Sequence, residues 1–143
     1  MAVEVHTNRY KAFLSYSQSD NSKPGEEWGD WLHQQLERYE IPPSLIGAPN
    51  RFGDSVSDSL YPIFRDQASL PSGGNLSEGI RSALLSSDCL VVICTPASAR
   101  SDWVRREIRE FKALGRGDRI VAVVVAGHFE RSHRRERARN RNR

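Results

Sequence analysis

Two continuous apolar segments limit the fold of this chain more than any other feature. Residues 89–94 (Cys-Leu-Val-Val-Ile-Cys) and residues 120–126 (Ile-Val-Ala-Val-Val-Val-Ala) are rich in β-branched side chains and contain no charged residue. A strand with one face in water alternates apolar and polar residues, whereas these two segments are apolar on both faces. They therefore predict strands of a parallel sheet that is covered by helices on both sides.

Residues 101–114, which lie between these segments, have the periodicity of an amphipathic helix. At about 100° per residue, the apolar side chains and Glu107 share an arc of about 140°. Glu107 is the only charged residue on that apolar face. An unpaired buried carboxylate costs several kcal/mol or takes up a proton, so we expect Glu107 to have a buried partner or to border a ligand cleft. The alternative is a carboxylate at the helix edge that reaches a nearby arginine.

The first third of the chain predicts a strand, a polar loop and a helix. Residues 10–16 form a short aromatic and aliphatic strand, and residues 17–22 are the loop that follows it. Pro24 and two acidic residues suit the start of a helix, which ends before the Pro-Pro pair at 42–43. The apolar residues at helical spacing are Trp28, Trp31, Leu32, Leu36 and Tyr39. Residues 42–59 are rich in Pro, Gly, Ser and Asp and predict a long surface connection.

Residues 60–65 predict a second strand, which belongs at the edge of the sheet because Pro62 cannot donate to a β-ladder. A loop over residues 66–74 follows. Asn75 and Glu78 have the spacing of a capping box, and an apolar stripe continues from them as a second helix: Leu76, Ile80, Ala83 and Leu84. Strands and helices thus alternate along the chain, which predicts an open α/β sheet.

The net charge of +3 comes from the end of the chain. Residues 130–143 carry seven Arg and two Glu and contribute +5, so residues 1–129 sum to −2. We therefore expect three parts: an extension over residues 1–9, a folded domain over residues 10–129, and a basic disordered tail over residues 130–143. Such a tail gives salt-sensitive, unspecific affinity for nucleic acid, and specific nucleic-acid binding by the domain is not expected.

Several classes of protein find no support in the sequence. No apolar run approaches the ~18 residues of a membrane span, and the first residues lack the layout of a signal peptide, so we expect a cytoplasmic protein without a membrane partner. Cys89 and Cys94 are five residues apart on one strand and point to opposite faces, so they do not form a disulfide with each other. Neither a metal-ligand cluster nor a glycine-rich nucleotide motif is present.

Four segments together resemble a Toll/interleukin-1 receptor (TIR) domain of the bacterial type. They are residues 10–17 (Tyr-Lys-Ala-Phe-Leu-Ser-Tyr-Ser), residues 64–66 (Phe-Arg-Asp) with the Pro71 loop, residues 87–96, and Trp103 with Glu107. The resemblance implies a flavodoxin-like fold with strand order 2-1-3-4-5, in which the second strand is an edge, as Pro62 requires independently. A ligand crevice is then expected at the topological switch between strands one and three, beside residues 15–17 and 95–96.

TIR domains of this kind either cleave NAD at the nicotinamide–ribose bond or assemble signalling complexes, and some do both. In the enzymes, a Glu at the place of Glu107 is catalytic, which implies an NAD nucleosidase with NAD as substrate, without a cofactor or metal. One carboxylate suffices, because nicotinamide leaves readily and the developing oxocarbenium ion needs a negative charge beside the ribose. The resemblance also implies self-association through contacts between TIR domains, in homo-oligomers or with other TIR proteins. The alternative function is a non-catalytic adaptor.

The residues expected to contact the substrate lie around the first strand, the second strand and the Trp103 helix: Phe13, Leu14, Ser15, Tyr16, Arg65, Asp66 and Trp103. For Phe13 and Trp103 the alternative is packing in the core. Ser15 could merely end its strand, and Arg65 with Asp66 could form only a local ion pair.

The end of the chain departs from the TIR pattern. After Gly127 the sequence has too little apolar content to supply the family's fifth strand and last helix. The strand at residues 120–126 is therefore expected to be an uncovered apolar edge, which is a site for association.

Overall fold

The computed structural model describes residues 9–22, 24–65 and 78–125. They contain a parallel four-stranded sheet with the order β2-β1-β3-β4. The strands are β1 (Tyr10–Ser15), β2 (Ile63–Arg65), β3 (Ser87–Cys94) and β4 (Ile120–Val124). The flavodoxin-like fold and the edge position of the second strand are thus confirmed for the four strands.

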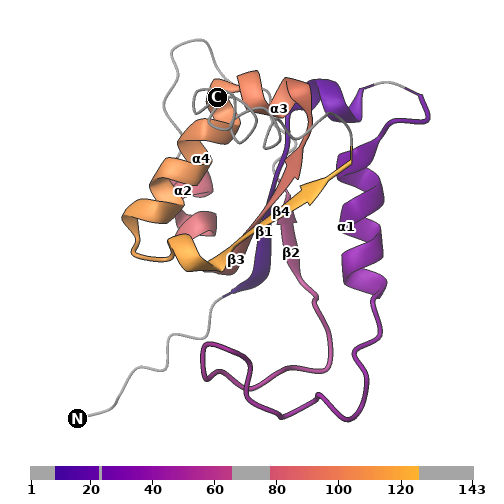
Figure 1. Ribbon diagram of the computed structural model, residues 1–143, viewed down its shortest axis with the longest axis vertical. Helices are drawn as coiled ribbons and strands as arrows, with labels where there is room; N and C mark the ends of the chain where they lie inside the picture. Colours follow the sequence, from indigo (N-terminus) through magenta and orange to yellow (C-terminus); the bar gives the residue numbers. More distant parts are fainter. Residues whose placement is uncertain (1–8, 23, 66–77, 126–143) are drawn as a thin grey trace, which may run out of the picture.

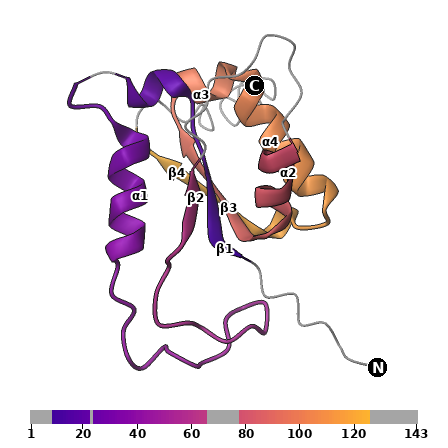
Figure 2. The ribbon, with the colours of Figure 1, turned by 180° about the vertical axis from the view of Figure 1, so that it is seen from behind.

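Helices cover both faces of this sheet (Figures 1 and 2). Helix α1 (Trp28–Arg38) lies on one face, and α2 (Glu78–Leu85) and α4 (Asp102–Ala113) lie together on the other. Three shorter helices occupy connections: η1 (Gln18–Asn21) after β1, α3 (Pro96–Arg100) after β3 and η2 (Gly117–Arg119) before β4. The three-layer arrangement agrees with the two-sided apolar pattern of the central strands.

Alternate residues of the strands pack into two separate hydrophobic cores, one on each face of the sheet. Toward α1, the strands and the helix bury Ala12, Leu14, Tyr16, Leu32, Ile63, Val91 and Ile93. Toward α2 and α4, the buried residues are Phe13, Ile80, Ala83, Leu84, Leu90, Val92, Trp103, Val104 and Phe111. Cys89 packs against the first core and Cys94 against the second, which confirms that their side chains lie on opposite faces.

The predicted elements and the structure differ mainly at the ends of the elements. Strand β2 begins at Ile63 rather than at residue 60, because Pro62 precedes the strand and joins the sheet only through its carbonyl, which accepts from the amide of Lys11 at 2.8 Å. Helix α3 was not predicted, since five residues are too few to show a helical period. The α1 stripe is narrower than predicted, with Trp31 and Tyr39 exposed to solvent. The predicted capping residue Asn75 lies outside the described residues.

Strand β4 is an edge of the described sheet. Its outer side pairs with no other strand of the residues described above, and Val121 and Val124 are 49% and 45% exposed. In the same described ranges no helix has the length and hydrophobicity needed to cross a membrane. The predicted tail over residues 130–143 lies outside the described residues.

Candidate active site

Glu107 is a buried carboxylate between α4 and the end of β1. Its residue is 1% exposed, and its Oε1 accepts a hydrogen bond of 2.7 Å from the hydroxyl of Ser15. The two residues are 92 positions apart in the sequence. Glu107 therefore has a buried partner, as predicted, and it does not lie at the edge of its helix.

The apolar face of α4 holds Glu107 in this place. Ser101 begins the helix as its N-cap, with its side chain accepting from the amide of Val104 at 3.3 Å. Trp103 is one turn before Glu107 and Phe111 one turn after it, and both are buried in the core that α4 shares with the sheet. Because residues three and four apart share a helix face, their packing turns Glu107 toward the sheet. Trp103 thus packs in the core, and its contact with substrate stays a prediction.

Four of the residues expected to contact the substrate, at positions 13–16, lie in β1 or just after it. The alternation of side chains along the strand places them on opposite faces of the sheet. Phe13 is fully buried in the core beneath α2 and α4, and Ser15, two residues later, points to the same side and reaches Glu107. Leu14 and Tyr16 belong to the opposite core, beneath α1. Tyr16 packs so closely on α1 that a Cβ atom added to Gly29 would lie 2.8 Å from its ring. Of these four, Ser15 donates a hydrogen bond to Glu107.

Arg65 lies on the α1 side of the sheet. It is paired in register with Leu14 on β1, and its guanidinium forms an ion pair with Asp30 of α1. The predicted local pair with Asp66 cannot be compared, because Asp66 lies outside the described residues. Arg65 therefore joins β2 to α1, on the face of the sheet that does not carry Glu107.

A second polar contact crosses the carboxyl end of the sheet and involves a residue that the sequence did not single out. The hydroxyl of Thr95, just after β3, donates to Asp20 Oδ2 of η1 at 2.5 Å. The same hydroxyl accepts from the amide of Ser98 and so caps α3. Asp20 is the one acidic residue of the loop over residues 17–22, but its distance in sequence from Thr95 hides the contact. The pair fixes η1 beside the switch point between β1 and β3, where a ligand crevice is expected.

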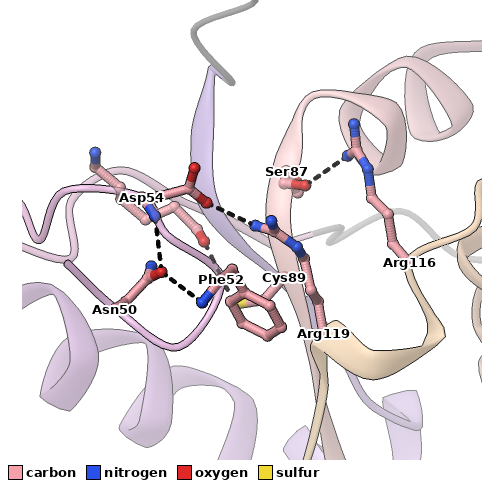
Figure 3. A network of polar contacts seen from close by, with 8 residues as sticks. Asn50, Phe52, Asp54, Ser87, Cys89, Arg116 and Arg119 are labelled. Carbon is pink, nitrogen blue, oxygen red and sulfur yellow. Dashed lines mark hydrogen bonds and ion pairs between the residues drawn. The ribbon is translucent and has the colours of Figure 1, made fainter.

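A cavity of about 660 Å³ lies at the other, amino end of the sheet. The connection between α1 and β2 covers it, and Arg119 fastens that connection (Figure 3). The Arg119 guanidinium lies 3.2 Å from a carboxylate oxygen of Asp54 and 4.2 Å from the ring centre of Phe52. Arg116 donates to two backbone carbonyls, those of Leu85 and Ser87. The cavity thus lies at the amino end of the sheet, whereas the buried carboxylate of Glu107 lies at the carboxyl end. We place the candidate site at Glu107, because the two arginines beside the cavity hold the fold together.

The cysteines contribute no activated nucleophile to either end of the sheet. Burial, followed by the nearby carboxylate of Asp88, raises the pKa of Cys89 to about 11. Burial also raises the pKa of Cys94. Both thiols are therefore neutral near pH 7. Within the described ranges, no three His, Cys, Asp or Glu side chains are grouped so that they could hold a metal ion.

Comparison with known proteins agrees with the fold. Residues 12–141 match the family model described as TIR domain. The chain belongs to the TIR domain family. A curated bacterial relative, the NAD(+) hydrolase ApTIR of Actinoplanes sp., is 28% identical over 121 residues, which are 85% of this chain. The TIR domain described here spans only 15% of the length of that relative.

Proposed function

We propose that this TIR domain cleaves NAD at the nicotinamide–ribose bond, with Glu107 as the catalytic carboxylate. The observation that carries the proposal is the burial of Glu107 at 1% exposure, with one carboxylate oxygen held by Ser15 at the end of β1. A desolvated carboxylate in the core costs stability, and such groups cluster at functional sites. The name of the Actinoplanes relative, an NAD(+) hydrolase, supports the same activity.

The chemistry requires little more than this carboxylate. In NAD the bond between ribose C1′ and the pyridinium nitrogen breaks, its electron pair goes to that nitrogen, and neutral nicotinamide leaves. Positive charge develops on the ribose ring, where a fixed carboxylate stabilises it. In hydrolysis, water then adds to C1′ and loses a proton, which gives ADP-ribose. No general acid is required, since the leaving group needs no proton.

The decisive experiment compares NAD with NADH as substrates for the same concentrated protein. We expect equimolar release of nicotinamide and an ADP-ribose product from NAD. NADH should remain intact, because its reduced ring carries no positive charge and is a poor leaving group. Cleavage of both dinucleotides to mononucleotides would show attack at the pyrophosphate instead, and would contradict the proposal, as would complete inertness toward NAD.

A second candidate function, a TIR adaptor that acts by self-association, is favoured by the apolar edge of β4. Val121 and Val124 are both about half exposed on a strand that has no charged residue or proline. Native proteins usually protect such edges, so an exposed one is a site for pairing. The two functions are compatible, and a concentration-dependent oligomer without any NAD cleavage would favour the adaptor alone.

A further inference from the structure

We infer that Ser15 is a positioning residue for Glu107, a role that rests on the proposed function and differs from contact with the substrate. Its hydroxyl donates to Glu107 Oε1 at 2.7 Å, and both residues are 1% exposed. A serine hydroxyl carries one proton, and here that proton is directed at the carboxylate. Ser15 therefore acts on the reaction through Glu107.

The backbone makes Ser15 a rigid reference point. Strand β1 lies between β2 and β3, and Ser15 is paired in register with Val92 of β3. A short side chain on a central strand can move its hydroxyl only by rotation about one bond. The glutamate side chain, by contrast, has three rotatable bonds and comes from a helix in another layer. The hydrogen bond from Ser15 thus restricts the rotation of the Glu107 side chain and holds its carboxylate at a fixed position relative to the sheet.

The contact also favours the charged form of Glu107. Burial disfavours a carboxylate anion, whereas a hydrogen bond donated to the anion favours it. The proposed reaction needs the anion in a defined place, since the developing charge on the ribose is stabilised only by a nearby negative group. Removing the Ser15 hydroxyl should therefore impair the chemical step more than the binding of NAD.

A matched pair of serine substitutions tests this inference. Ser87 is also buried, and its hydroxyl donates to the carbonyl of Ala83 at 2.6 Å, at the other end of the sheet from Glu107. Ser15→Ala should lower kcat by about ten- to hundredfold, the range expected for losing a hydrogen bond to a charged group, with KM changed less than about threefold. Ser87→Ala loses a comparable buried hydrogen bond but should keep the kcat of the wild type.

Two further variants separate the hydroxyl from the shape of the side chain. Ser15→Thr keeps the hydroxyl and should retain most of the activity, whereas Ser15→Cys keeps the size but donates weakly and should behave like Ser15→Ala. An unchanged kcat in Ser15→Ala would overturn the inference. A rise in KM with kcat preserved would also overturn it, because that result indicates direct contact with NAD.

A double-mutant cycle in urea unfolding tests the contact independently of NAD cleavage. It compares the wild type, Ser15→Ala, Glu107→Met and the double variant, since methionine removes the acceptor at similar length. Coupling of about tenfold or more in the unfolding equilibrium constant supports the positioning contact even if the wild type does not cleave NAD, in which case only the proposed function fails. Additive effects of the two substitutions would refute the contact itself.

Discussion

Replacing Glu107 by glutamine is the sharpest perturbation of this TIR domain. Glutamine keeps the length of the side chain and still offers a carbonyl oxygen to the Ser15 hydroxyl, so the 2.7 Å contact can persist. It removes the negative charge and replaces the other carboxylate oxygen by an amide NH2 group. Because the residue is 1% exposed, solvent cannot replace that charge when the oxocarbenium ion forms.

The expected loss of activity can be set against the expected change in stability. Removing one preorganised electrostatic group typically costs about 10²–10³ in rate, or about 3–4 kcal/mol of transition-state stabilisation, and we expect at least this loss in kcat. A neutral amide is easier to bury than a carboxylate, so the free energy of unfolding should stay within about 1 kcal/mol of the wild type or rise. The variant should therefore lose activity without losing stability.

The assay follows nicotinamide release in single turnover, beside urea unfolding of the same samples. Glu110→Gln is the matched control, because Glu110 is on the same helix, 42% exposed at its side chain, and 3.4 Å from Arg81. That variant should keep its activity. Full turnover by a well-folded Glu107→Gln protein would refute the assignment of the catalytic residue.

Three other predictions concern assembly, the end of the chain and the partly buried thiol of Cys89. If the domain acts as an oligomer, NAD cleavage should rise faster than linearly with protein concentration; strict proportionality over a hundredfold dilution, with a monomer throughout, would argue against this. Deleting residues 130–143 should leave NAD cleavage intact and abolish binding to DNA at low salt, because residues 1–129 carry −2. The pKa of Cys89 is raised from its ordinary value of 9.0 to about 11 in the folded protein. Between these two pH values the thiol is ionised in the unfolded chain but still protonated in the folded one, which favours unfolding. Stability should therefore fall by roughly 2–3 kcal/mol as pH rises from 9 to 11, and Cys89→Ala should lack that decline in a pH series of urea unfolding.

The sequence was sufficient for the fold and for the unusual residue of α4. The apolar strands, the edge position that Pro62 requires and the helical period around Glu107 are all local patterns, so they could be read without knowing any contact between distant segments. Strand alternation is also a local pattern, and it places Ser15 on the opposite face of the sheet from Leu14 and Tyr16.

The partners of the polar groups could not be predicted in the same way. Thr95 bonds to Asp20, 75 positions away, and Arg65 pairs with Asp30, which lies in another layer of the fold. These pairs depend on the order of the strands and on which helix covers which face. Several acids and hydroxyls of the polar loops were equally plausible partners, and only the packed layers select among them.

The connection between α1 and β2 has a practical consequence because of where it lies. It joins the sheet at the amino end, where Asp54 and Phe52 contact Arg119, whereas Ser15 ends β1 at the opposite end (Figures 1 and 3). The six residues of β1 span about 20 Å at roughly 3.3 Å per residue. A fluorophore or a fused partner attached at the exposed turn around Gly53 would sit a full strand length from Glu107. This turn is therefore a suitable attachment point for tethering copies of the domain at controlled density on a surface.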